Sequence, residues 1–201
     1  GISERGSAYT WCINAHGYRL TPWLNGPVKG ACGEAFYIRD ESSGFFWSPM
    51  PLPATGKGNY ITKHGVGYSV FEHVEQAIFS QTTVFTDLED SIRFHLIKLK
   101  NESAVERTLS LSAFMEWVLG DEPGKQIRHI VTQQHAETKS LWATNRYNTV
   151  FGKRVSFLDC DIEDYTYTCV RREFIGRNRS LQTPAAMTLK KLSNTAGAGF
   201  D

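Results

Sequence analysis

The sequence has little net charge and no long apolar run. Its 201 residues carry 22 basic and 21 acidic side chains, which leaves a formal net charge of +1. Such a balance creates no strong field to attract a phosphate backbone or an anionic lipid surface. No apolar stretch approaches the roughly 18 residues that a membrane-spanning helix requires. We therefore expect no nucleic-acid partner and no membrane contact for this chain.

Cysteines are few and widely spaced. Cys12, Cys32, Cys160 and Cys169 form no C-x-x-C pair, and their spacing fits neither a zinc ribbon nor a redox motif. Four free thiols in a reducing environment is the interpretation we favour, although an even count would also permit two disulfides. The sequence accordingly predicts no metal site and no cofactor.

An initiator methionine is also absent, and the chain closes on a run of small residues. Residues 197–201 read Gly-Ala-Gly-Phe-Asp, in a stretch that resembles an entry into further sequence. We expect residues 1–201 to be a single β-sandwich domain excised from a larger protein. Residues 181–201 would form a tail that leaves the sandwich.

The sequence does contain many segments with the residue pattern of β-strands. Across residues 107–120 polar residues alternate with an apolar set of period two, which is typical of a half-buried strand. The apolar set is Leu109, Leu111, Ala113, Met115, Trp117 and Leu119. Residues 91–100 carry a second β pattern, and residues 101–103 (Asn-Glu-Ser) have the composition of a turn. These two segments are expected to pair as a long hairpin.

Further strands are expected at short intervals along the chain. Residues 34–39 and 45–48 predict a second hairpin around a turn that contains Gly44. The remaining expected strands cover residues 60–72, 76–86, 141–145, 154–158, 165–170 and 171–175. Residues 126–138 could form one short helix. Many short strands without β-α-β alternation favour an all-β sandwich with at most short helices.

Groups that could carry catalysis are present but weakly organised. Residues 34–41 and 159–164 each hold several carboxylates, and glycoside hydrolysis needs a pair of them. Solvated loop acids explain the same residues equally well. His64 and His73 lie at opposite ends of one β segment, and neither belongs to a metal-ligand motif. We therefore assign no catalytic residue.

Aromatic side chains crowd the first quarter of the chain and alternate with polar ones. Sugars bind by laying C–H faces on aromatic rings while planar polar groups bracket their hydroxyls. The aromatic set is Trp11, Tyr18, Trp23, Phe36, Tyr37, Phe45, Phe46 and Trp47, with Arg19 and Arg39 among the polar neighbours. A second cluster, Asn145-Arg146-Tyr147-Asn148, places a guanidinium where it could hold an anion or a pair of hydroxyls. Ordinary core packing and a solvated turn are the competing interpretations.

Ordered motifs along nearly the whole chain resemble one family, the cellobiose and chitobiose phosphorylases. The resemblance is strongest to the corresponding module of cyclic β-1,2-glucan synthases. The motifs are Leu20-Thr21-Pro22-Trp23-Leu24-Asn25-Gly26-Pro27, Gly33-Glu34-Ala35-Phe36-Tyr37-Ile38-Arg39-Asp40, Phe46-Trp47-Ser48-Pro49, Lys63-His64-Gly65-Val66-Gly67-Tyr68-Ser69, Phe114-Met115-Glu116-Trp117-Val118-Leu119-Gly120, Ala143-Thr144-Asn145-Arg146-Tyr147-Asn148 and Phe174-Ile175-Gly176-Arg177-Asn178. Two departures are visible, because Gly26 stands where the synthases usually carry an acid and residues 28–32 differ from their usual loop.

The resemblance implies a large antiparallel β-supersandwich, similar to the galactose mutarotase fold, that precedes an (α/α)₆ barrel. In such proteins the catalytic acid belongs mainly to the barrel, so the chain alone is expected not to be an enzyme. It would support the cleft for a β-linked glucan or glucoside, pack on the missing barrel and help to form a homodimer. The candidate sugar-contacting residues are Tyr18, Arg19, Trp23, Arg39, Trp47, Arg146 and Tyr147.

Other functions stay open at this point. The chain could be an independent sugar-binding module, a mutarotase-like epimerase that uses His64 or His73, or a structural assembly domain. The resemblance implies a bacterial cytoplasmic location, or the cytoplasmic side of a larger membrane-associated synthase.

Overall fold

A computed structural model describes residues 1–23 and 32–197. Contacts divide the described chain into two compact units. The first unit comprises Gly1–Ala8 and the described part of 24–115, and the second comprises Tyr9–Trp23 and the described part of 116–201. The expectation of a single domain over residues 1–201 stays a prediction.

A four-stranded antiparallel sheet forms one layer of the first unit. Its strands follow one another in the order β3, β4, β5 and β6. They are β3 (Tyr60–His64), β4 (Tyr68–Glu75), β5 (Ile78–Thr86) and β6 (Arg93–Asn101). Strands were expected across these residues, but residues 60–72 form two strands rather than one. The hairpin between β3 and β4 turns at Gly67, whose φ of 82° lies in the left-handed region that glycine adopts readily.

The second layer of this unit is a three-stranded sheet in the order β2, β1, β7. Its strands are β1 (Glu34–Asp40), β2 (Phe46–Trp47) and β7 (Leu109–Met115), all antiparallel. The hairpin expected over residues 34–48 is therefore confirmed. Its turn is held by Asp40, whose Oδ1 accepts hydrogen bonds from the backbone N–H of Ser42 at 2.8 Å and the hydroxyl of Ser42 at 2.6 Å.

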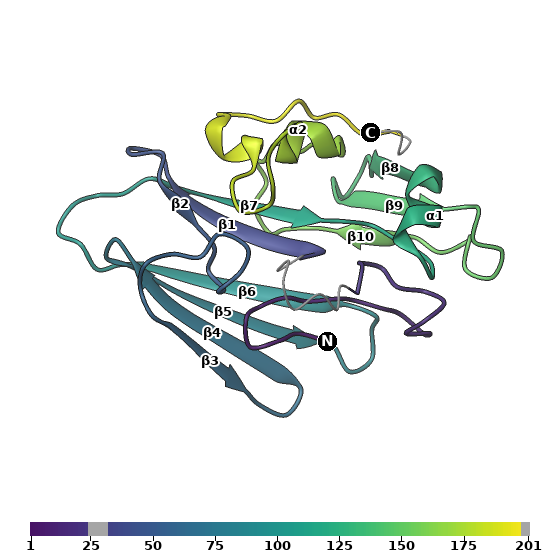
Figure 1. Ribbon diagram of the computed structural model, residues 1–201, viewed down its shortest axis with the longest axis horizontal. Helices are drawn as coiled ribbons and strands as arrows, with labels where there is room; N and C mark the ends of the chain where they lie inside the picture. Colours follow the sequence, from purple (N-terminus) through teal and green to yellow (C-terminus); the bar gives the residue numbers. More distant parts are fainter. Residues whose placement is uncertain (24–31, 198–201) are drawn as a thin grey trace. The chain divides into compact units, whose positions relative to one another are not determined.

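Figure 1 shows the two sheets of the first unit as two layers. Apolar side chains pack between them. Phe36 of β1 packs with Phe71 of β4 and Val84 of β5. Ile38 of β1 packs with Trp47 of β2 and Ile78 of β5. These contacts follow from period-two alternation, which turns every second side chain of a strand toward the same face. The first unit is thus a sandwich of antiparallel sheets.

One predicted pairing in this region is wrong. β6 pairs with β5, and β7 pairs with β1, so the two neighbouring segments do not form a hairpin. The strand expected over 107–120 also ends at Met115. β1 forms seven consecutive pairs with β7 and is buried along both faces, which makes β7 its ladder partner. Sequence adjacency predicted the wrong partner because both segments carry a strand period.

Three short strands and several short helices make up the second unit. The sheet has the order β10, β9, β8. Its strands are β8 (Ile130–Gln134), β9 (Leu141–Asn145) and β10 (Ser156–Leu158). The helices are α1 (Pro123–Gln126), η1 (Ile127–His129), α2 (Arg171–Ile175) and η2 (Ala185–Thr188). Buried Tyr18, Leu119, Ile130 and Ala143 form one core cluster of this unit.

Two predictions fail in this unit. The helix expected over residues 126–138 is mostly β8, and residues 171–175 form α2 rather than a strand. A single helical turn suits Arg-Arg-Glu-Phe-Ile, because it buries Phe174 and Ile175 together while Glu173 accepts a hydrogen bond from the hydroxyl of Thr168 at 2.7 Å. Residues 165–170 contain one isolated bridge, Thr168 to Thr195, instead of a strand.

Among the helices in residues 1–23 and 32–197, none is long and apolar enough to cross a membrane.

Candidate functional site

Arg19 and Trp23, both predicted sugar contacts, lie together in the second unit. The guanidinium carbon of Arg19 lies 5.7 Å from the centroid of the Trp23 ring, which is within the range of a cation–π contact. Trp23 is 55% exposed and stacks on Tyr9 with ring centroids 5.8 Å apart. These three residues, called here the Trp23 cluster, present an open aromatic surface beside a fixed positive charge.

Hydrogen bonds fix the Arg19 guanidinium in place. Nε donates to the carbonyl of Ala15 and Nη1 to the carbonyl of Asp121, each at 3.1 Å. Nη2 lies 3.2 Å from Nδ1 of His16. The backbone of Arg19 also pairs with that of Gly120. The cation is therefore preorganised, so a ligand that stacks on Trp23 would not have to order it.

Tyr18 is a core residue rather than a surface contact. It is buried, stacks on Phe151 with ring centroids 4.7 Å apart, and its hydroxyl lies 3.5 Å from Oγ of Ser156. Burial raises the pKa of its phenol. Its packing anchors the strand-like segment that carries Arg19.

Two more predicted contacts, Arg39 and Trp47, belong to the first unit. Arg39 donates from Nε and Nη2 to the two carboxylate oxygens of Glu41, at 2.9 and 2.6 Å. These bonds from Arg39 lower the pKa of the Glu41 carboxyl. Trp47 has 0% exposure and packs in the core with Ile38 and Ile78. Neither residue offers a free group to a sugar in this structure.

Arg146 and Tyr147 follow β9 and have different surroundings. Tyr147 is 60% exposed and stacks on His129, with ring centroids 4.1 Å apart. Arg146 lies in the turn that follows Asn145 and lines an open hollow of about 870 Å³. Tyr147 is not among the residues that line this hollow.

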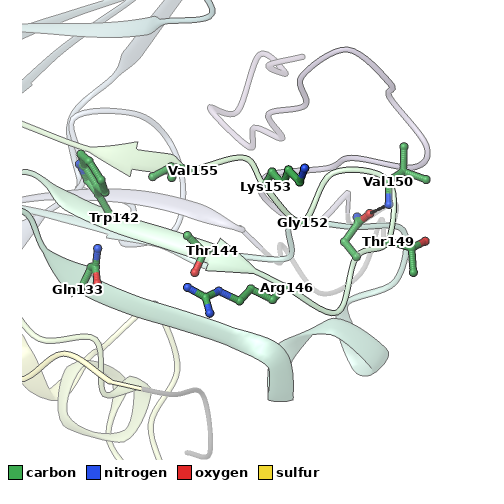
Figure 2. A pocket seen from close by; sticks show the side chains of 10 residues that line it. Gln133, Trp142, Thr144, Arg146, Thr149, Val150, Gly152, Lys153 and Val155 are labelled. Atoms are coloured by element: carbon green, nitrogen blue, oxygen red, sulfur yellow. Dashed lines mark hydrogen bonds between the residues drawn. The ribbon is translucent and has the colours of Figure 1, made fainter.

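Figure 2 shows this hollow, called here the β9 hollow. Trp142 and Thr144 lie on the same face of β9 as Arg146, and the Arg146 side chain extends back toward Thr144. Gln133 of β8 is the register partner of Trp142 and shares that face. Lys153, Val155 and the turn 148–152 complete the lining.

Trp142, which was not a predicted site residue, also lines the β9 hollow. Its Nε1–H donates to Oγ of Ser140 at 2.9 Å, and its ring stacks on His135 with centroids 4.1 Å apart and planes 10° apart. These contacts hold the ring in one orientation. Period-two alternation through residues 142 and 144 was the available signal, because it places Trp142 on the same face of β9 as Thr144.

The candidate catalytic groups are paired, buried or solvated. Glu34 accepts a hydrogen bond from Arg93 at 2.8 Å, and Asp40 is paired with Arg107. Residues 159–164 are exposed. His73 is buried and stacks on Tyr60 at 3.7 Å, while His64 lies at the far end of the β3–β4 hairpin and is exposed. Within the described ranges, no group of three or more His, Cys, Asp or Glu side chains could hold a metal ion.

Comparison with known proteins identifies the family. The family model described as the glycosyl hydrolase 94 supersandwich domain matches residues 1–201. The chain belongs to the glycosyl hydrolase 94 supersandwich domain family. The supersandwich expected from the sequence motifs is thereby confirmed, with antiparallel sheets and only short helices. The motif residues 24–27, the departure at Gly26 and residues 28–31 of the differing loop lie outside the described part of this supersandwich domain.

Curated relatives of the supersandwich domain are a glucan synthase and several phosphorylases. The cyclic β-(1,2)-glucan synthase NdvB of Rhizobium meliloti (strain 1021) is 31% identical, over 92% of this chain and 7% of the relative. N,N'-diacetylchitobiose phosphorylase of Vibrio proteolyticus is 23% identical, over 97% of this chain and 25% of the relative. Solabiose phosphorylase of Paenibacillus borealis is 35% identical, over 83% of this chain and 22% of the relative. The supersandwich domain thus spans a quarter or less of each of these relatives.

Proposed function

We propose that this chain is a non-catalytic, carbohydrate-associated module of a glycoside phosphorylase or a β-1,2-glucan synthase-like glycosyltransferase. It would support the sugar cleft of a separate (α/α)₆ barrel in the same parent protein. The parent would act on β-linked glucans or glucosides, in the bacterial cytoplasm or at the cytoplasmic side of a membrane-associated synthase. The module itself would need no cofactor.

One observation carries this proposal. The supersandwich family model matches residues 1–201, and the same residues align with a quarter or less of three carbohydrate-active relatives. In a phosphorylase parent, phosphate would attack the anomeric carbon while a carboxylic acid of the barrel protonates the leaving oxygen. Two of the candidate carboxylates of this chain, Glu34 and Asp40, are bound to arginines, which does not favour that role for them.

The Trp23 cluster supports direct contact with sugar. An exposed indole ring accepts the C–H face of a pyranose, and the fixed guanidinium of Arg19 can donate to neighbouring hydroxyls. Arg146, in the β9 hollow, and the exposed Tyr147 remain proposed contacts. Arg39 and Trp47 do not support the proposal in this structure, since one is bound to Glu41 and the other is fully buried.

The outer face of β3–β6 supports packing against the rest of the parent chain. Tyr68, Phe85, Phe94 and Leu96 lie on that face and are exposed, and the rings of Phe85 and Phe94 stack 5.1 Å apart. A cluster of large apolar side chains of this kind is typical of a surface that another protein domain covers. The occupant we propose is the barrel, because the relatives continue far beyond the matched segment. The other partner that we propose is a second copy of the parent protein, which would form a homodimer.

Burial of His73 argues against one of the two histidines considered for a mutarotase-like epimerase, while His64 is exposed. A catalytic acid or base must reach a proton on the substrate, and His73 has no exposed side-chain surface. An independent sugar-binding module remains a second candidate, since the Trp23 cluster could serve it equally.

Isothermal titration of the chain with sophorose, cellobiose and chitobiose tests the proposed sugar contact. We expect binding of at least one β-linked disaccharide, and Trp23→Ala should weaken it at least tenfold. Tyr68→Ala is the matched control, because it removes another half-exposed aromatic ring outside the cluster. Absence of heat at millimolar concentrations of every sugar would contradict direct binding and leave only a structural role.

A further inference from the structure

The segment 119–121 holds Arg19 but contains a residue in an unfavourable backbone conformation. Arg19 and Gly120 each donate a backbone N–H to the carbonyl of the other at 3.1 Å, and the carbonyl of Asp121 accepts from Nη1 of Arg19. Leu119 has a φ of 48°, in the left-handed region that residues with a Cβ rarely adopt. Such a conformation persists only where the surrounding structure holds it in place. Other contacts must therefore hold this segment.

Two buried amide side chains make those contacts. Asn145 ends β9 and is 2% exposed, and Gln126 ends α1 and is 6% exposed. Nδ2 of Asn145 donates to the carbonyl of Leu119 at 3.2 Å and to Oε1 of Gln126 at 2.6 Å. Nε2 of Gln126 donates to Oδ1 of Asp121 at 2.8 Å. A Cβ atom at Gly120 would lie 2.6 Å from Cδ of Gln126, so this side chain lies directly against the backbone that pairs with Arg19.

The hydrogen bonds of these amides run in one direction. Oδ1 of Asn145 accepts from the backbone N–H of Tyr147 at 3.1 Å, which turns Nδ2 of Asn145 toward Gln126. The bond from Gln126 lowers the pKa of the Asp121 carboxyl, and an ionised carboxylate only accepts hydrogen bonds. Each amide therefore has one orientation. Asn145, Gln126 and Asp121 are called here the amide relay.

We propose that Asn145 and Gln126 are positioning residues for the guanidinium of Arg19. They act through the segment 119–121, and their burial keeps them from contacting a ligand. Without the relay, the segment would relax and Arg19 would lose its fixed partners there, so a ligand at the Trp23 cluster would have to order the cation. This inference deepens the proposed function by naming what fixes the cation beside Trp23, and only its sugar readout rests on that function.

The mobility of the Arg19 guanidinium in the absence of ligand tests the proposal. Asn145→Asp keeps the side-chain shape but places a carboxylate against Oε1 of Gln126. The order parameter of the Arg19 Nε–H bond, measured by NMR relaxation, should fall from about 0.85 to below about 0.6. Gln126→Met breaks the middle of the relay without adding a charge, and it should have the same effect in a folded protein. Order parameters that stay at the wild-type value in both variants would overturn the proposal.

A destabilising substitution elsewhere in the second unit is the matched control. Glu173 accepts hydrogen bonds from the hydroxyls of Thr168 at 2.7 Å and Ser193 at 2.6 Å, outside the amide relay. Glu173→Ala should lower the unfolding midpoint and leave the order parameter of Arg19 unchanged. An equal fall in the order parameter with Glu173→Ala would show that general loss of stability explains the effect, and would overturn the positioning role.

A double variant tests whether the relay acts as a unit. In Asn145→Asp combined with Asp121→Asn, the amide of Gln126 can turn over, donate to the introduced carboxylate and accept from the introduced amide. The order parameter of Arg19 should therefore be higher in the double variant than in Asn145→Asp alone. General destabilisation does not predict such a rescue. A further fall in the double variant would show that the two side chains act independently, and would overturn the relay.

Titration with sophorose distinguishes this inference from the proposed function. Asn145→Asp should weaken sophorose binding at least fivefold, but less than twofold in a protein that also carries Arg19→Gln, because its effect passes through Arg19. Equal weakening with and without Arg19→Gln would overturn action through Arg19. A wild-type chain that binds no sugar would contradict the proposed sugar contact, and the order parameters would still decide whether Asn145 and Gln126 position Arg19.

Discussion

The guanidinium of Arg107 binds the carboxylate of Asp40 through two of its nitrogens. Nε lies 2.8 Å from Oδ2, and Nη2 donates to the same oxygen. Asp40 ends β1, and Arg107 lies just before β7, so the pair joins the two strands where their ladder begins. Both side chains are largely buried.

Stability should therefore fall in strong acid. The hydroxyl of Ser42 and the guanidinium of Arg107 lower the pKa of Asp40 from its usual 3.8 to about 2. Because the folded-state pKa lies below the unfolded one, Asp40 stabilises the fold above about pH 4, and this contribution is lost as the pH falls toward 2. Urea unfolding between pH 7 and pH 2 measures this loss.

Asp40→Asn should remove that acid-dependent component and lower stability at pH 7 by about 3 kcal/mol, since it leaves a largely buried arginine without its carboxylate. Glu72→Gln is the matched control, because Glu72 pairs with the exposed amine of Lys63 at 2.8 Å. Its effect should be small. Equal effects of the two substitutions would contradict a structural role for the Asp40–Arg107 pair.

Gly58 should not tolerate a side chain. A Cβ atom there would lie 2.1 Å from the carbonyl oxygen of Val74, and the backbone N–H of Gly58 already donates to Oε2 of Glu75 at 3.2 Å. Gly58→Ala should lower the free energy of unfolding by about 1–3 kcal/mol, as overpacking does elsewhere. Gly124→Ala is the control, because its Cβ would meet nothing within 4 Å and it should leave stability unchanged. Thermal unfolding of both variants measures the difference.

Alanine substitutions of Trp47 and Trp23 should have different effects: the first should lower stability, and the second should weaken sugar binding. Trp47→Ala would leave a cavity in the core beside Ile38 and Ile78, and it should destabilise the fold by about 3–5 kcal/mol. Trp23→Ala removes an exposed ring and should affect sugar binding while leaving the unfolding midpoint nearly unchanged. A stable Trp47→Ala protein with impaired sugar binding would instead return Trp47 to the site.

The sequence predicted individual strands better than their partners. Residues 34–48 formed the expected hairpin, because a polar turn with Gly44 separates two short apolar segments. β6 and β7 did not pair, because a period of two identifies a strand but not the strand it will face. α2 was missed because a five-residue segment is too short for a helical period to distinguish it from a strand.

The candidate site was also predicted only in part, because residue types indicated candidates but not which of them are buried. Arg19 and Trp23 come together over a short sequence distance, and the aromatic and basic residue types pointed to them. Trp47 was a candidate for the same reason, but burial depends on tertiary packing that residue type does not specify. Lys153 was missed because it reaches the face of β9 only after the turn 148–152. Trp142 was missed although strand alternation places it on the same face of β9 as Thr144.

A paired glycosyl-transfer assay most directly tests whether this supersandwich domain is a non-catalytic module. The 201-residue chain and the full-length protein read from its coding region would each be incubated with β-linked glucosides, with and without inorganic phosphate. We predict sugar phosphate or elongated glucan from the full-length protein and no product from the chain alone. Turnover by the chain alone, or a coding region that ends after Asp201, would contradict the proposed division between sandwich and barrel.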